Sequence, residues 1–201
     1  MSKSRFEAFT DGVFAIAITL LVLEIHIPDL QQATDGDMIT WIRGLAPSLL
    51  TFVLSFATIG VIWINHHAAF MRIRHVDRTG NLLNLLLLLT VCFVPYPTAL
   101  LARYGPLPAS TALYGISFFL MGASYGALLL YSNWYQRQVD PTALTLSWPR
   151  RIRGTIGSLI YLFGACIAFW VPKVSVGLYV LVTLYYVIPE RSDRIQSNVT
   201  P

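Results

Sequence analysis

The residues best suited to chemistry in this chain are ionisable and amide side chains that border long apolar runs. Thr10 and Asp11 open the first apolar run, and Asn65, His66 and His67 follow the second. Ionisable groups at membrane depth are costly unless they face protein or water, so they mark candidate sites. A histidine beside a carboxylate can titrate near neutral pH. This cluster could therefore relay protons, gate a pathway or hold helices together.

The composition places these residues in a membrane protein. Hydrophobic residues make up 55% of the 201 residues and charged residues only 12%, whereas soluble domains average about 25% charged residues. A helix of about 20 apolar residues crosses a bilayer. We therefore expect an all-α polytopic fold, one domain over residues 1–201 with six transmembrane helices. The expected spans are Thr10–Ile27, Trp41–Ile64, Asn81–Ala102, Ala109–Tyr131, Thr155–Val171 and Val174–Ile188.

The distribution of basic residues predicts the orientation of these spans. Cytoplasmic loops carry an excess of Lys and Arg. With the N-terminus inside, eleven basic residues lie on inner segments and three on outer ones, so both termini are predicted to be cytoplasmic. The inner set is Lys3, Arg5, Arg72, Arg74, Arg78, Arg137, Arg150, Arg151, Arg153, Arg191 and Arg194, and the outer set is Arg43, Arg103 and Lys173.

The first outer loop is acidic. It contains Asp29, Asp35 and Asp37, whose charges would attract cations to the outer mouth of a pathway. The alternative is an ordinary solvated loop.

The two polar clusters should meet in the inner half of the bilayer, because the first span starts inside and the second ends inside. Asp11 and Thr10 then have candidate partners in Asn65, either histidine and the indole donor of Trp63. The network either only joins helices or also relays protons or gates. A third convergent metal ligand is missing from this pattern, so we expect neither a metal site nor another cofactor.

The first span also carries an aliphatic stripe. At 100° per residue, the stripe is about 80° wide and Asp11 points about 140° away from Ile16. Such a stripe faces lipid or protein, or lines a pore. Its members are Gly12, Ile16, Leu20, Leu23 and Ile27, with Thr19 at the edge.

The run from Arg5 to Glu24 closely resembles the first-span signature of the transmembrane protein 175 family. These are potassium channels of endosomes and lysosomes, with short prokaryotic relatives. The family pattern is Arg-x-x-x-Phe-Ser-Asp, which Arg5, Phe9, Thr10 and Asp11 match with threonine in place of serine. The Trp63-x-Asn65-His66-His67 cluster is also similar to the family, so the resemblance covers essentially the whole chain.

The resemblance implies a homotetramer in a prokaryotic plasma membrane that conducts K⁺ passively. Selectivity should be modest, because an apolar lining replaces no lost water with ordered oxygen ligands. Four copies of the first helix would line the pore. A ring of Ile16 would form the main constriction, with Thr19, Leu20 and Leu23 also facing the pore. The resemblance also implies a polar network that joins Arg5, Thr10 and Asp11, beside Phe9, to Trp63, Asn65 and one of His66 and His67.

A proton-coupled transporter is the rival interpretation, with Asp11 and His66 or His67 as coupling groups. Unitary currents would distinguish a channel from this transporter. An enzyme is not expected, because the chain lacks a nucleotide loop, a zinc-protease motif and a serine elbow. The net charge of +4 follows from the loops and is not taken as evidence for nucleic acid binding, so the expected partners are the lipid bilayer and K⁺ ions.

Overall fold

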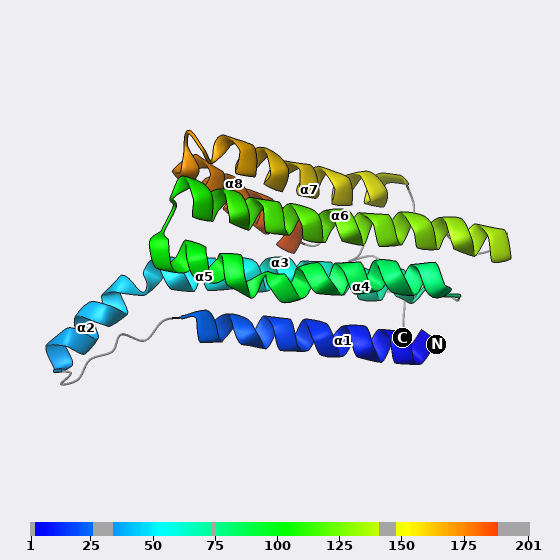
Figure 1. Ribbon diagram of the computed structural model, residues 1–201, viewed down its shortest axis with the longest axis horizontal. Coiled ribbons are helices and arrows are strands. Elements are labelled where there is room, and N and C mark those ends of the chain that lie inside the picture. The colour runs from blue at the N-terminus through cyan, green and yellow to red at the C-terminus, as the bar shows by residue number, and fades with distance from the viewer. Residues whose placement is uncertain (1–2, 26–33, 74, 141–147, 189–201) are drawn as a thin grey trace.

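The computed structural model describes residues 3–25, 34–73, 75–140 and 148–188, with side chains omitted for 148–154. These residues form a bundle of helices that run close to one common direction, with α1 at one edge and α7 at the opposite edge (Figure 1). The elements are α1 Lys3–Leu20, the 3-10 turn η1 Leu21–Glu24, α2 Asp35–Gly44, α3 Ala46–Phe70, α4 Arg78–Phe93, α5 Pro95–Tyr104, α6 Pro108–Val139, α7 Trp148–Ile167 and α8 Pro172–Val187.

The described residues confirm the expected all-α fold, with helices suited to a membrane. Four helical stretches in the described part of the chain are long and apolar enough to cross a bilayer: Lys3–Glu24, Ala46–Phe70, Arg78–Tyr104 and Pro108–Val139. Thr155–Ile167 and Pro172–Val187 are apolar but shorter. The count of six spans therefore stays a prediction.

The predicted second span, Trp41–Ile64, is divided in the structure. Helix α2 ends at Gly44 and α3 runs on to Phe70, so the polar cluster lies inside α3 rather than after it. Pro47 stands in the first turn of α3 and has no N–H to donate to Arg43. The Leu45 amide donates instead to Ile42 O at 3.2 Å, and the chain changes direction there.

The third span contains a break that its prolines predict. Pro95 and Pro97 lack the N–H that would donate to Val91 and Phe93 in a regular helix, and here α4 ends at Phe93 and α5 begins at Pro95. Helix α5 then ends before Gly105, whose φ of 68° suits glycine.

Helix α6 is the central element of the bundle. It packs mainly against α7 and α4 and also contacts α5 and α8. Its 32 residues span about 48 Å, more than the roughly 30 Å hydrocarbon core of a bilayer. A Cβ at Gly115 would collide with Tyr179 of α8, and one at Gly122 would collide with Ser158 of α7. Small residues therefore set the close approach of these helices.

Two groups of buried hydroxyls are paired across the helices. Ser55 bonds to Thr98 at 2.9 Å and to Tyr114 at 3.0 Å. Thr183 bonds to Tyr161 at 2.8 Å and to Thr58 at 2.9 Å. Paired hydroxyls avoid the cost of leaving polar atoms unsatisfied in an apolar interior.

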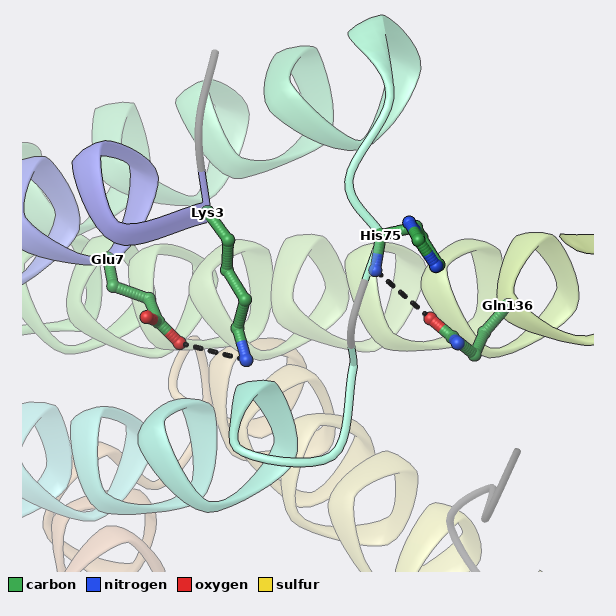
Figure 2. A network of polar contacts seen from close by, with 4 residues as sticks. All are labelled: Lys3, Glu7, His75 and Gln136. Carbon is green, nitrogen blue, oxygen red and sulfur yellow. Dashed lines mark hydrogen bonds and ion pairs between the residues drawn. The ribbon is translucent and has the colours of Figure 1, made fainter. Parts of the chain in front are cut away.

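The end of the bundle where α1 begins is polar. Figure 2 shows Lys3 paired with Glu7 at 3.6 Å, and the His75 amide donating to Gln136 Oε1 at 3.3 Å. The second contact ties the connection between α3 and α4 to α6.

Asp77 begins α4 at this same end. Its carboxylate accepts from the Gly80 amide at 2.9 Å and from the Tyr131 hydroxyl at 2.6 Å. Burial raises the pKa of Asp77, but these hydrogen bonds outweigh burial and hold the pKa below its ordinary value. Asp77 therefore caps α4 as a carboxylate and links it to α6.

Candidate functional site

One face of α1 anchors the helix to the bundle. Phe6, Thr10, Phe14 and Ala17 are buried, and Leu21 in η1 is fully buried. These residues recur at intervals of three or four, so they share one side of the helix. Helix α1 contacts α3 and α4, and this face is its packing surface.

The predicted stripe lies on the other face and is not covered by the chain itself. The exposed fractions are 61% for Ile16, 42% for Leu20 and 72% for Leu23. Thr19 is also exposed, and its hydroxyl donates to Ile16 O at 2.9 Å. This hydrogen bond satisfies the hydroxyl within its own helix. An uncovered aliphatic strip of this kind indicates contact with lipid, with another protein surface or with a pore.

Asp11 meets Trp63 across the α1–α3 contact. The Trp63 indole N–H donates to Asp11 Oδ1 at 2.9 Å. Trp63 is 38% exposed and stacks on His67, with ring centroids 6.0 Å apart. The structure thus joins Asp11 to α3 through the indole donor expected from the sequence, with His67 packed behind it.

Thr10 starts a second, buried chain of hydrogen bonds. Its hydroxyl donates to Phe6 O at 2.9 Å and accepts from Asn84 Nδ2 at 2.8 Å. Asn84 Oδ1 lies 3.3 Å from His66 Nε2. The His66 ring stacks on Phe70 with centroids 4.4 Å apart. Three helices, α1, α3 and α4, are therefore joined by one continuous chain of polar contacts.

Asn84 is the member of this chain that the sequence analysis missed. It stands in the leucine-rich run of α4, and it is 2% exposed. An amide in the middle of an apolar run is itself a signal, because it needs a partner at membrane depth. The partner is Thr10 of α1, and the spacing of residues along α4 does not show which helix supplies it.

The remaining predicted members of the network lie outside these contacts. Arg5, Phe9 and Asn65 are exposed, and the described hydrogen bonds between the helices do not include them. Asn65 instead lines a cavity of about 60 Å³ between α3, α6, α7 and α8, which is room for only a few waters. The roles of these three residues stay predictions.

Two of the three acidic residues predicted at the outer mouth, Asp35 and Asp37, lie in the first turn of α2. Asp29 lies outside the described residues, and so does Ile27 of the aliphatic stripe. The Thr34 hydroxyl donates to Asp37 Oδ2 at 2.7 Å, and the Asp37 amide donates to Thr34 Oγ1 at 3.3 Å. The hydrogen bonds from the hydroxyl and the amide of Thr34 hold the pKa of Asp37 below its ordinary value. Asp37 is therefore ionised at neutral pH.

The site holds helices together and presents an apolar surface, and its residues do not suit metal binding. Within the described residues, three or more His, Cys, Asp or Glu side chains nowhere gather closely enough to hold a metal ion. The polar contacts satisfy one another, and the carboxylate of Asp11 meets an indole rather than an imidazole.

Comparison with known proteins finds channels that are similar to this chain. Residues 5–95 match the family model described as endosomal/lysosomal potassium channel TMEM175. A potassium channel of Streptomyces collinus is 37% identical over 194 residues, which cover 92% of this chain and 91% of the relative. The endosomal/lysosomal proton channel TMEM175 of Mus musculus is 40% identical over 101 residues, covering 47% of this chain and 20% of the mouse protein.

A solved structure has the same fold. The crystal structure of a lysosomal potassium-selective channel TMEM175 homolog from Chamaesiphon minutus superposes with a TM-score of 0.78 at 34% sequence identity. The superposition covers 92% of this chain and 95% of that one.

Proposed function

Because this chain belongs to the TMEM175 family of channels, we propose that it is a passive potassium channel in which α1 of four copies lines one central pore. The family also confirms that the chain is a channel rather than an enzyme. Potassium conduction is carried over from the names of the relatives in Streptomyces collinus and Chamaesiphon minutus.

The observation that carries the proposal is the division of α1 into two faces. Thr10 and Asp11 fasten the helix to α4 and α3, while Ile16, Leu20 and Leu23 are exposed. A single helix cannot enclose a pathway, so several copies must surround it. Four copies with these side chains turned inward make stacked aliphatic rings, with the Ile16 ring as the narrowest.

The rings select ions by the cost of removing water. An ion that passes a tight apolar ring sheds part of its hydration shell, and K⁺ is larger and less tightly hydrated than Na⁺. Since no ordered oxygen atoms replace the lost water, the preference for K⁺ is modest. The same rings stop conduction when they lose their water, because hydrophobic constrictions gate by dewetting.

The polar chain of Thr10, Asn84 and His66 keeps each pore helix in place. It holds the rotation of α1 about its own axis, so that Ile16 points to the pore axis rather than toward α3. Arg5, Phe9 and His67 belong to the same anchor in this proposal, whereas Asn65 faces the cavity between α3, α6, α7 and α8.

We propose six spans with both termini in the cytoplasm of a prokaryote. The shorter helices Thr155–Ile167 and Pro172–Val187 supply the fifth and sixth spans, and the excess of basic residues on the inner side sets the orientation. Asp35 and Asp37 then lie on the outer side, where they attract cations.

A second candidate is proton permeation, which the name of the mouse relative favours. The proton-coupled transporter built on Asp11 and His66 or His67 is the less direct version of it, because Asp11 bonds to Trp63 instead. Purified protein in a planar bilayer, with K⁺ opposite Na⁺ and then with a proton gradient alone, tests all three. Unitary currents that reverse toward the K⁺ potential support the proposal. Flux without unitary currents refutes it.

A further inference from the structure

The connection between α3 and α4 presents cationic side chains at the end of the bundle where α1 begins. Arg72 lies two residues after α3 ends, and Arg78 is the first residue of α4. Both side chains are exposed. Among the described residues, neither guanidinium has a carboxylate partner, and Glu7, at the same end of the bundle, is paired with Lys3. The two positive charges are therefore available to a partner outside the chain.

The acidic residue of this connection is turned into the fold. Both carboxylate oxygens of Asp77 are hydrogen-bonded, one to the Gly80 amide at 2.9 Å and the other to the Tyr131 hydroxyl at 2.6 Å. The backbone is also fixed, because the His75 amide donates to Gln136 of α6 (Figure 2). The connection is thus held against α6 at two points, and the Asp77 carboxylate serves α4 and α6 rather than the arginines.

The depth of this connection in a membrane follows from the aromatic residues beside it. Because Tyr131 and Gln136 bond to the connection, residues 131–136 of α6 lie level with it. Trp134 belongs to this stretch, is 56% exposed and packs against Tyr131 with ring centroids 5.7 Å apart. Tryptophan and tyrosine are enriched where the hydrocarbon of a bilayer meets the headgroups. The two arginines therefore lie at the height of the lipid headgroups.

We propose that Arg72 and Arg78 bind the phosphate groups of anionic phospholipids in the leaflet at this end of the bundle. A guanidinium can bond to two phosphate oxygens at once, and basic residues beside a membrane span attract anionic lipids. A soluble phosphate compound offers the same group, but the exposed tryptophan at the same height favours a ligand that is itself part of the bilayer. The site lies within one subunit, so it requires neither four copies nor a pore.

A lipid at this site acts on the helices that anchor α1. Arg72 follows α3, which holds α1 through Trp63, and Arg78 begins α4, which holds α1 through Asn84. A ligand that binds the folded protein and not the unfolded chain raises stability by mass action. Anionic lipid should therefore raise the unfolding temperature, and loss of either arginine should reduce this gain.

Native mass spectrometry of the full chain in detergent tests the site, because it resolves bound lipids one by one. Phosphatidylglycerol is the anionic probe, and phosphatidylcholine with the same acyl chains is the neutral one. The variant is Arg72→Gln with Arg78→Gln. Each substitution is also made alone, which answers the same question if the pair does not fold. The matched control is Arg43→Gln with Arg103→Gln, which removes two exposed arginines from the ends of α2 and α5 and lowers the net charge equally.

We expect phosphatidylglycerol to bind more tightly than phosphatidylcholine. Each basic residue near an anionic surface contributes about fivefold to affinity. Each single substitution should therefore weaken the binding of phosphatidylglycerol about fivefold, and the pair about 25-fold, while the binding of phosphatidylcholine stays unchanged. The matched control should bind both lipids as the wild type does, and the unfolding temperatures should follow the same order.

Three outcomes would overturn the proposal. Equal affinity of the wild type for the two lipids is the first, and a loss in the variant no greater than in the matched control is the second. The third is displacement of phosphatidylglycerol by an equal concentration of free glycerol phosphate, which would make this a site for soluble phosphate compounds. None of these results bears on conduction, which the planar-bilayer experiment measures separately.

Discussion

Replacing Ile16 by asparagine is the sharpest test of the proposed pore. Ile16 is 61% exposed in the subunit, so the substitution empties no core site, and exposed substitutions change stability by about 0.5 kcal/mol or less. The tetramer should therefore assemble as before. What changes is the ring: four amide groups face the ion at the point where it has lost most of its water.

The size of the effect follows from how strongly amide oxygens attract each cation. The carbonyl oxygen of asparagine coordinates a cation through its dipole, and the smaller Na⁺ gains more from each oxygen than K⁺ because attraction rises as distance falls. A difference of about 1 kcal/mol between the ions lowers the K⁺ to Na⁺ permeability ratio about fivefold. Conductance should rise at the same time, because the barrier falls for both ions.

Reversal potentials under bi-ionic conditions measure this ratio. A fivefold loss of preference moves the reversal potential by about 40 mV toward zero, since tenfold corresponds to about 59 mV for one charge. Ile18→Asn is the matched control, because Ile18 points about 160° away from Ile16 and packs against the core. It should lower stability without raising conductance. Unchanged selectivity in a conducting Ile16→Asn tetramer would remove Ile16 as the filter.

Three further predictions concern the anchor and the helix caps. Asp11→Ala should reduce the tetramer yield, read by mass measurement, more than it alters selectivity; a normal yield with a changed K⁺ to Na⁺ ratio would contradict the anchoring role. Asn84→Ala leaves Thr10 and His66 without their shared partner and should lower the free energy of unfolding by about 1–3 kcal/mol. Denaturation in detergent measures this loss, and a loss near zero would refute the buried chain of hydrogen bonds. The pKa of Asp77 is lowered in the folded state. The ionised carboxylate therefore stabilises the fold at any pH above the ordinary carboxyl pKa, and this stabilisation is lost as the pH falls through the lower pKa of the folded state. Asp77→Asn should therefore destabilise the protein at neutral pH and weaken its acid sensitivity, and an unchanged pH profile would speak against the cap.

The first helix could be interpreted from sequence because its two faces carry different chemistry. The 100° periodicity separates Ile16, Leu20 and Leu23 from Asp11, and the structure leaves these three exposed while Asp11 bonds to Trp63. The meeting of Asp11 and Trp63 also follows from topology, since antiparallel neighbours bring the start of one helix to the end of the next.

Asn84 and α2 could not be predicted in the same way. Asn84 bonds to Thr10, 74 residues away along the chain, and its position follows from how α4 packs on α1, which local spacing does not specify. The first outer loop was expected to continue to Trp41, but α2 begins at Asp35. The Thr34 side chain accepts from the Asp37 amide and Asp37 caps Thr34 in return, so the helix starts earlier than its apolar content suggests.

In the proposed channel, the separation of anchor and pore on α1 lets one helix serve both folding and conduction. Thr10 and Phe14 are buried and contact other helices, so changes there disturb the subunit itself. Ile16 and Leu20 contact little of their own chain, so their side chains are free to set the width and polarity of a pathway. Their positions still depend on the buried face, because the helix is rigid and its rotation is held by the contacts of Thr10 and Asp11. A change in the anchor therefore acts on all the rings together, whereas a change in one ring acts on that ring alone.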